Sequence, residues 1–240
     1  EKTMVDIPIR GELWDNDSAD ILRWMGWRDL TAPMDIQAAL EAAGGEDVTI
    51  LVNSPGGDMT VGAEIRSMLR RYQGKTTALV QGYAASAATL AISACRTIQS
   101  EAGALLCYHN PSSTTEGDYR AMKRSAESLR NARDAILEMY TARKGAKSRE
   151  ELMALMDKDV WINPSQAKEY GLVDEVVGME EAQDLLDDPA AFVAATGHRM
   201  RLTAAMRERY QAHVAEERAK EAREDEARRA LARISALAKF

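Results

Sequence analysis

The stretch that decides the fold reads Val48-Thr49-Ile50-Leu51-Val52-Asn53-Ser54-Pro55-Gly56-Gly57. Its first five residues are apolar or β-branched, which predicts a short buried strand that ends at the Pro-Gly-Gly turn. From Thr60 to Tyr72, apolar residues recur at three- and four-residue spacing, which predicts a helix. A strand followed at once by a helix is the beginning of a βαβ unit.

The same order of elements repeats further along the chain. Thr76–Val80 has the composition of a second buried strand, and Ala84–Ala94 that of a second helix. Strands and helices that alternate at short intervals indicate an α/β fold with a largely parallel sheet covered by helices. Such sheets open their binding clefts at the carboxyl ends of the strands, where the Pro-Gly-Gly turn and the segment after Val80 both fall.

The middle of the chain continues with one strand and three helices. Ala102–Tyr108 is expected to be a buried strand that carries His109 at its end. Ser148 and Glu151 have the spacing of a capping box, in which each residue satisfies a free donor of the other. The three expected helices are a long one from Gly117 to Lys144, a shorter one from Ser148 to Met156, and one that begins at Asn163 and stops at Gly171.

The composition changes beyond about Met179, first to acidic residues and then to a tail rich in Ala, Arg and Glu. From Arg199 onward there are 11 basic and 7 acidic side chains, so the preceding part carries a net charge of −11. We therefore expect a folded domain over residues 1–179 and a charged helical extension over residues 180–240. One apolar stripe would run along that helix, through Ala227, Leu231, Ile234 and Leu237.

Two interpretations of the tail remain open at this point. It is either a solvated or partly disordered helix, or a helix that binds a partner or a second copy through its stripe. The first residue, Glu1, leaves room for a missing initiator or leader.

Length and composition exclude several classes of protein. The 240 residues are enough to bury a full core, and no apolar run reaches the length of about 18 residues that a membrane-spanning helix needs. No signal peptide is evident, so we expect a soluble protein that is not exported and has no membrane partner. The net charge of −7 argues against nucleic acid as the main partner. Cys95 and Cys107 lack a metal-binding spacing, which predicts reduced core thiols, no zinc or other metal, and no cofactor.

The segment Gly82-Tyr83-Ala84-Ala85-Ser86-Ala87-Ala88-Thr89 places one hydroxyl in a run of very small residues. Neighbours this small let a substrate backbone approach Ser86 closely. A serine hydroxyl becomes nucleophilic when a base removes its proton and a third group orients that base. Of the three histidines, His198 and His213 lie in the charged tail, so His109 is the candidate base.

The carboxylate and the oxyanion donors are less sharply indicated. Asp157 and Asp159 both lie between a helix and an apolar segment, and spacing alone does not choose between them. Acyl transfer also needs backbone donors for the developing oxyanion, which the Gly56 turn and the Ala87 amide can supply. Each feature has an ordinary structural explanation by itself: a helix-packing serine, a structural histidine, a common turn. Their joint occurrence in this order, after successive strands, favours catalysis.

Four separated motifs resemble the Clp protease proteolytic subunit family, serine peptidases with a crotonase-like α/β fold. The resemblance runs from about Ile7 to Val177 and rests on these motifs in order: Val52 to Gly57, Gly82 to Ala88, His109-Asn110-Pro111, and Ala167-Lys168-Glu169-Tyr170-Gly171-Leu172-Val173-Asp174. It implies that Ser86 is the nucleophile, His109 the base, and Gly56 with Ala87 the oxyanion hole. Counted back from the last motif, the catalytic aspartate of the family falls on Asp159.

The resemblance also implies where substrate binds and how the protein assembles. A substrate strand would pair with backbone at Gly57 and Asp58 and at Asn110 and Ser112, a mode that reads main chain more than side chains. Family members form rings around their active sites, so a homo-oligomer is implied.

Two segments depart from the housekeeping members of the family. The segment Asn110–Asp118 lacks their glycine-rich strand, which leaves the usual contact between two rings in question. Asp159-Val160-Trp161-Ile162-Asn163 is more similar to the Clp-related head maturation proteases of tailed bacteriophages. Those relatives process capsid and scaffolding proteins in an assembling procapsid, and a scaffold-like helical tail fits that task.

The leading interpretation is therefore an ATP-independent serine endopeptidase of phage head maturation, located in the cytoplasm of a bacterial host or inside the procapsid. Three alternatives remain open: a proteolytic subunit fed by an unfolding ATPase, a crotonase-fold CoA binder, and a non-catalytic scaffold. Because the three side chains come from separate segments, a small shift of the Gly117–Lys144 helix could misplace His109, so an inactive resting conformation is also expected.

Overall fold

The computed structural model describes residues 4–178 and 203–237. The chain forms two compact units, one made of Glu1–Ala19 and Arg28–Gly197, the other of Asp20–Trp27 and His198–Phe240. The domain boundary expected at residues 179 and 180 lies outside the described residues. Each unit is considered by itself below.

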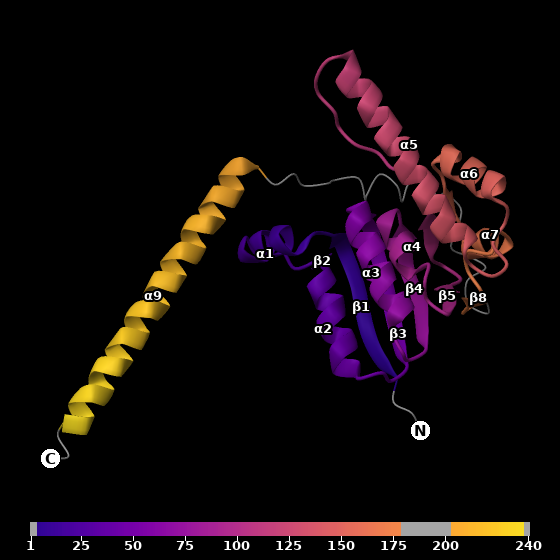
Figure 1. Ribbon diagram of the computed structural model, residues 1–240. Coiled ribbons are helices and arrows are strands. Elements are labelled where there is room, and N and C mark those ends of the chain that lie inside the picture. The colour runs from indigo at the N-terminus through magenta and orange to yellow at the C-terminus, as the bar shows by residue number, and fades with distance from the viewer. Residues whose placement is uncertain (1–3, 179–202, 238–240) are drawn as a thin grey trace. The chain divides into compact units, whose positions relative to one another are not determined.

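The first unit is built on a mixed but mainly parallel sheet, with the strand order β2-β1-β3-β4-β5-β8 (Figure 1). A short branch leaves this path where β6 pairs in parallel with β4 and antiparallel with β7. The predicted α/β fold with a parallel sheet is confirmed. The strands are β1 (Val5–Leu13), β2 (Leu30–Thr31), β3 (Val48–Gly57), β4 (Thr76–Ala85), β5 (Thr97–Glu101), β6 (Leu105–Cys107), β7 (Trp161–Ile162) and β8 (Glu175–Val177).

The two central strands are longer than the sequence pattern predicts. Strand β3 does not stop at the Pro-Gly-Gly turn but continues through Gly57, because Gly56 and Gly57 still pair with β1. Strand β4 runs on to Ala85, because Ala84 and Ala85 pair with β6. The predicted strand over 102–108 was wrong in extent. It is only the three-residue β6, and β5 before it was not predicted.

The helices in the described residues are α1 (Asn16–Trp24), α2 (Pro33–Ala43), α3 (Met59–Arg71), α4 (Ala87–Ile92), α5 (Tyr119–Thr141), α6 (Arg149–Lys158), α7 (Pro164–Glu169) and α9 (Ala204–Leu237). Six of these helices were predicted from local sequence patterns, whereas α1 and α2 were not predicted. The helix predicted over 84–94 is shortened at both ends, since its first two alanines belong to β4. The capping box of Ser148 and Glu151 is present at the start of α6, and Asn163 caps α7 as predicted.

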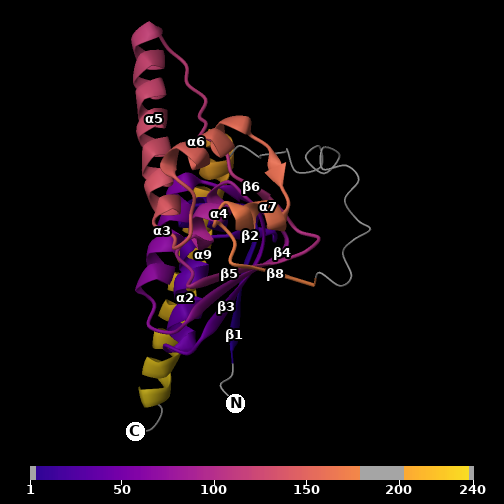
Figure 2. The same cartoon turned by 90° about the vertical axis from the view of Figure 1, so that its right-hand side faces the viewer.

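Helix α4 lies at the centre of the packing of this unit. All six of its residues are buried, and it packs against α3 and the sheet. Helix α5, in contrast, projects beyond the sheet in both views (Figures 1 and 2). Its buried residues are Ile136, Leu137 and Tyr140, all in its last third, so only the C-terminal end of α5 belongs to the core.

The helix predicted for the tail is present as α9, a 34-residue element of the second unit. The predicted apolar stripe falls on residues whose side chains lie outside the description, so its two interpretations stay predictions. Among the helices of the described chain, none combines the length and apolarity that crossing a membrane requires.

Candidate active site

Ser86 occupies the turn between the end of β4 and the start of α4. Its φ of 55° and ψ of −129° lie where residues with a side chain are rarely found. Its N–H donates a hydrogen bond of 2.9 Å to the carbonyl of Cys107 on β6, which holds the turn in place. A tight, strained turn from strand to helix is the device by which several hydrolases expose a nucleophilic serine.

Gly56 makes this turn possible. A Cβ at Gly56 would lie 2.7 Å from the Cβ of Ser86 and 2.5 Å from the carbonyl oxygen of Ala85. Gly62 plays a similar part on α3, where a Cβ would lie 2.5 Å from the carbonyl of Ala87. The two glycines therefore let β3 and α3 approach the Ser86 turn more closely than any other residue would.

Ser86 and His109 line the same small cavity, of about 30 Å³. Ser86 reaches it from the end of β4, and His109 from the segment that follows β6. The remaining wall is mainly apolar and consists of Met59, Ala87, Leu90, Pro111, Ile136 and Tyr140. The structure thus brings the predicted nucleophile and the predicted base together, although 23 positions separate them in the sequence.

The ring of His109 has a defined hydrogen-bond partner. Its Nδ1 lies 2.7 Å from the carbonyl oxygen of Asn110. A carbonyl only accepts, so Nδ1 carries the hydrogen, and in the neutral ring Nε2 is then the acceptor. This is the tautomer that a general base for a serine requires. The carbonyl of Asn110 occupies the position at Nδ1 that the resemblance assigns to Asp159.

Asp159 ends α6 with a left-handed backbone, at φ 50° and ψ 50°, and its side chain is exposed. Within residues 4–178, no hydrogen bond joins Asp159 to His109, or His109 to Ser86. The register of the sheet nevertheless brings the two chain segments together. Cys107 pairs with Trp161 across the antiparallel β6–β7 pair, so the segments that carry His109 and Asp159, each two residues from these positions, both adjoin this pair of strands.

The pKa of Cys107 also indicates that Asp159 lies near the end of β6. Burial in the first place, and the negative charge of Asp159 in the second, raise the pKa of the Cys107 thiol to about 12. Asp159 therefore acts on the end of β6, two residues before the histidine.

Asp157, the other carboxylate that spacing left open, bonds to the residue after the histidine. Its Oδ1 accepts a hydrogen bond of 2.7 Å from Nδ2 of Asn110. The Oδ1 atom of Asn110 is buried and finds no hydrogen-bond partner among the residues that the structure describes. Asp157 thus anchors the Asn110 segment, whereas the contact seen for Asp159 is its electrostatic effect on Cys107.

The two N–H groups predicted to bind the oxyanion differ in whether they already donate a hydrogen bond. Ala87 is the first residue of α4, so its N–H has no carbonyl in a preceding turn to bond. The N–H of Gly56 donates to Oγ of Ser54 at 3.1 Å, and that hydroxyl donates in turn to the carbonyl of Gly11 at 2.6 Å. Gly56 can therefore bind an oxyanion only when its bond to Ser54 is shared or released.

The predicted substrate-binding residues lie on both sides of the site. Gly57 ends β3 opposite Leu13, and the N–H of Asp58 donates to the carbonyl of Leu13 at 3.0 Å. The Asp58 carboxylate caps α3, the carbonyl of Asn110 is held by His109, and Ser112 is exposed. Backbone groups at Gly57, Asp58 and Asn110, three of the four positions, are thus already engaged within the chain.

The hydrogen bonds that join Ser86, Thr89 and Tyr140 were not predicted. The hydroxyl of Thr89 donates to the carbonyl of Ser86 at 2.7 Å, so its bond of the same length to Tyr140 has the Tyr140 hydroxyl as donor. Burial raises the pKa of Tyr140, which keeps the phenol protonated. The partner of Tyr140 lies 51 residues away, so the sequence around Tyr140 gave no local signal of this bond.

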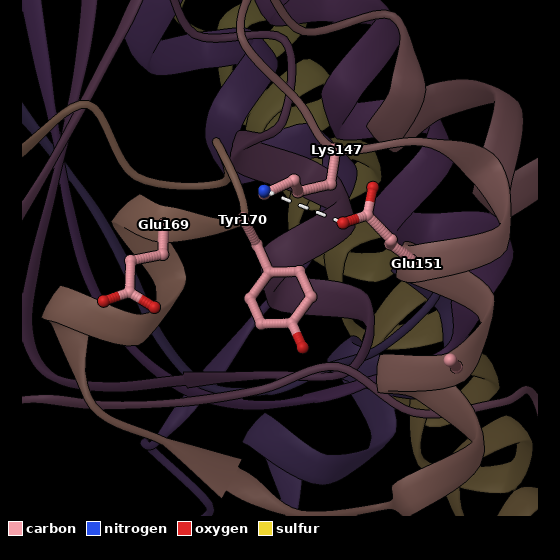
Figure 3. A pocket seen from close by; sticks show the side chains of 5 residues that line it. Lys147, Glu151, Glu169 and Tyr170 are labelled. Carbon is pink, nitrogen blue, oxygen red and sulfur yellow. Dashed lines mark ion pairs between the residues drawn. The ribbon is translucent and has the colours of Figure 1, made fainter.

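A larger cavity, of about 530 Å³, lies at α6 and α7 and contains neither Ser86 nor His109. Figure 3 shows the Lys147 ammonium directed toward the Glu151 carboxylate, with Tyr170 and Glu169 drawn from the end of α7; the ammonium and the carboxylate are 3.7 Å apart. The lining offers no nucleophile next to a base, so the size of a cavity does not identify the reactive site here.

Comparisons with known proteins agree with this geometry. The model of the Clp protease family matches residues 34–180. The chain is 34% identical over 133 residues to the ATP-dependent Clp protease proteolytic subunit 1 of Streptomyces avermitilis, which covers 55% of this chain and 61% of the relative. It is 31% identical over 140 residues to the corresponding subunit of Mesostigma viride, with 57% and 60% covered.

The fold is also found among solved structures. A mutant of ClpP1 from Listeria monocytogenes superimposes with a TM-score of 0.58 at 21% sequence identity, covering 72% of this chain and 90% of that one. The matches span about three fifths of the length of the curated relatives. From the family model, which covers more than half of the chain, and from the agreement in fold, we conclude that this chain belongs to the Clp protease family.

Proposed function

We propose that this chain is a serine endopeptidase of the ClpP type, with Ser86 as nucleophile, His109 as general base and Asp159 as the group that orients His109. The observation that carries the proposal is the position of Ser86. It lies in a strained turn after a central strand and lines one small cavity with His109. Membership of the Clp protease family supports the same reaction class.

In the proposed reaction, Oγ of Ser86 attacks the carbonyl carbon of the scissile peptide bond while Nε2 of His109 takes its proton. The N–H groups of Ala87 and Gly56 stabilise the tetrahedral oxyanion. His109 then protonates the leaving amine, which departs and leaves an ester on Ser86. A water molecule, activated by the same histidine, hydrolyses that ester and restores the serine.

Besides a hydrogen bond between Nε2 of His109 and Oγ of Ser86, two local rearrangements would bring the site into its working geometry. Nδ1 of His109 would exchange the carbonyl of Asn110 for the carboxylate of Asp159, whose segment leads into β7 beside β6. The hydroxyl of Ser54 would release or share the N–H of Gly56. Both changes involve single hydrogen bonds, so we infer that the structure corresponds to a resting conformation.

We further propose that the active form is a homo-oligomer, with a ring as its expected arrangement. Helix α5 supports this, because it projects from the core and exposes Tyr119 and Met122, with 72% and 43% of their surfaces accessible. Contacts on α5 would act on the site through Tyr140, which lies on the same helix and bonds to Thr89.

For the biological role we propose ATP-independent processing of capsid and scaffolding proteins during the maturation of a phage head, inside a bacterial host cell. This rests on the likeness of the Asp159–Asn163 segment to phage relatives and on the long charged helix α9. A second candidate is degradation together with an unfolding ATPase. It is favoured by the names of the relatives, both of which are called ATP-dependent.

The test compares the parent chain with Ser86→Ala and with the control Ser67→Ala on α3, whose hydroxyl takes part in none of the hydrogen bonds described. We expect a fluorophosphonate probe to label the parent and Ser67→Ala, and not Ser86→Ala. Cleavage of a capsid and scaffold mixture should follow the same order, and mass spectrometry of the products gives the bonds cut. Undiminished cleavage by pure Ser86→Ala would contradict the proposal.

The two candidate roles are separated by a second measurement. If the phage role is correct, unfolded capsid or scaffold protein is cleaved without nucleotide. If degradation requires a partner ATPase, folded substrates disappear only when that ATPase and ATP are added.

A further inference from the structure

A cavity of about 290 Å³ lies where the end of α3, the segment after α4 and the end of α5 meet. It is distinct from the Ser86 cavity and shares no lining residue with it. Its charged lining residues are Arg66, Arg70, Arg96, Arg143, Lys144 and Asp174. Five cations thus face one carboxylate.

That carboxylate is already neutralised by its partners. The Oδ2 atom of Asp174 accepts a hydrogen bond of 2.7 Å from Nη2 of Arg143 and one of 2.6 Å from the N–H of Ile98. Burial raises the pKa of the Cys95 thiol in the same wall to about 12, so this group adds no negative charge near neutral pH. The lining therefore keeps a net charge of about +4.

Arg143 is a buried and firmly positioned residue in the wall of this cavity. Only 6% of its side chain is exposed. Its Nη1 donates to the carbonyls of Ser93 and Cys95 at 3.1 Å each, which fixes the guanidinium plane at the end of α4. Its Nε is buried and has no acceptor within the described chain. An unpaired donor on a buried charged group is costly, so the positive charge of Arg143 is not fully satisfied by its partners in the described chain.

Of the other four cations, one is hydrogen-bonded within the chain and three have side chains without such a partner in the described residues. Nε of Arg66 donates to Oγ of Ser93 at 2.9 Å, and burial, then the charges of Arg70 and Arg143, lower the pKa of this guanidinium. Within residues 4–178, no hydrogen bond or ion pair engages the side chains of Arg70, Arg96 and Lys144. The cations repel one another here, and a bound anion would relieve that repulsion.

We propose that this cavity binds a phosphate-type oxyanion, either free or as part of a phosphorylated ligand. Guanidinium groups present paired N–H donors that match the oxygens of phosphate, and four of them line this one open cavity. The excess of positive charge favours a multiply charged anion over a monovalent one. Apolar ligands and cations are disfavoured by the same lining. This proposal is independent of the proteolytic activity.

The experiment uses the full chain and measures binding of inorganic pyrophosphate and of ADP by calorimetry, at an ionic strength held constant with sodium chloride. The pocket variant carries Arg70→Gln, Arg96→Gln and Lys144→Gln, all at cations without another partner. The matched control carries Arg28→Gln, Lys75→Gln and Lys168→Gln, three exposed cations outside the cavity with the same total change in charge.

We expect the parent and the control to bind pyrophosphate and to gain melting temperature when they do. The dissociation constant of the pocket variant should be higher by about tenfold or more. ADP that binds as tightly as pyrophosphate would show that the phosphates alone are recognised, and tighter ADP binding would identify a phosphorylated organic ligand. Either pattern of binding supports the proposed site if the pocket variant no longer binds. Absence of binding by the parent, or equal loss in the control, would overturn the proposal.

Discussion

At the residue scale, the proposed chemistry of this chain depends on close contact between Ser86 and Gly56. Ser86 holds a positive φ, and the Cβ of any residue in place of Gly56 would collide with Ser86 and Ala85. Strain of this kind persists only when the surrounding structure enforces it. The turn therefore tolerates substitution less well than its small residues suggest.

Gly56→Ala should lower the free energy of unfolding by about 2–4 kcal/mol and abolish labelling of Ser86, because φ is 86° and the nearest atom to the new Cβ is at 2.5 Å. Gly103→Ala is the control, since its Cβ would meet nothing within 4 Å. Urea denaturation and fluorophosphonate labelling measure both effects. Similar destabilisation by the two variants would show that close contact at Gly56 does not matter.

The two carboxylates near His109 should have different effects on catalysis. Asp159→Asn is expected to lower kcat/KM for a peptide substrate by about 10³–10⁴-fold, because the orienting negative charge is lost. Asp157→Asn, which only weakens the contact to Asn110, should cost less than about tenfold. The reverse order of effects would identify Asp157 as the orienting group.

At the element scale, α5 is joined to the Ser86 turn by the hydrogen bond between Tyr140 and Thr89. The end of α5 is buried, whereas its beginning projects from the core. A change at the projecting end can therefore reach the nucleophile through a single element. The bond between Tyr140 and Thr89 is therefore a physical route by which a shift of α5 would alter the site.

Tyr140→Phe should lower the free energy of unfolding by about 1 kcal/mol, because Thr89 keeps its bond to Ser86 and loses only one buried donor. The rate of Ser86 labelling should fall at the same time. Tyr119→Phe, at a residue that is 72% exposed on the same helix, should change the free energy of unfolding by less than about 0.5 kcal/mol. Unchanged labelling in Tyr140→Phe would separate α5 from the site.

Local signals were enough for most helices. The boundaries of α3 and α5 follow their apolar periodicity, and the capping residues Ser148 and Asn163 mark where α6 and α7 begin. The start of α4 was placed too early, because alanines favour a helix while pairing with β6 keeps Ala84 and Ala85 in a strand. Strands β1, β2 and β5 lacked a pattern strong enough to predict.

At the scale of the whole molecule, the two buried thiols couple stability to alkaline pH. Burial raises the pKa of both Cys95 and Cys107 from 9.0 to about 12. Between these values the folded state holds protons that the unfolded state has lost, so unfolding becomes easier as pH rises. Their contribution is fully present below pH 9 and is lost as pH approaches 12.

We expect the free energy of unfolding to fall between pH 9 and 11 by up to about 1.4 kcal/mol per pH unit for each thiol. The double variant Cys95→Ala with Cys107→Ala should show a shallower slope, whatever its stability at pH 7. Urea titrations at pH 7 to 11 measure both slopes. Parallel slopes in the parent and the variant would show that the thiols do not carry the effect.

The sequence by itself determined the family of this chain and the candidate residues of its site. The strand and helix periodicities, the small residues around Ser86 and the order of the four motifs are local properties, which depend on side-chain size and spacing along the chain. They led to an α/β fold of the Clp protease type, now shown, and to Ser86, His109 and Asp159 as the candidate triad.

Only the tertiary structure decided which atoms meet. The bond of His109 to the Asn110 carbonyl, the bond of Gly56 to Ser54, and the convergence of Arg66, Arg96 and Arg143 on one cavity all join groups whose partners depend on backbone geometry or on distant segments. Hydrogen bonds and charge interactions act over a few ångströms in space and leave no periodic trace in the sequence. The sequence therefore names the candidate catalytic groups, whereas packing determines the hydrogen bonds that these groups make and creates the basic cavity.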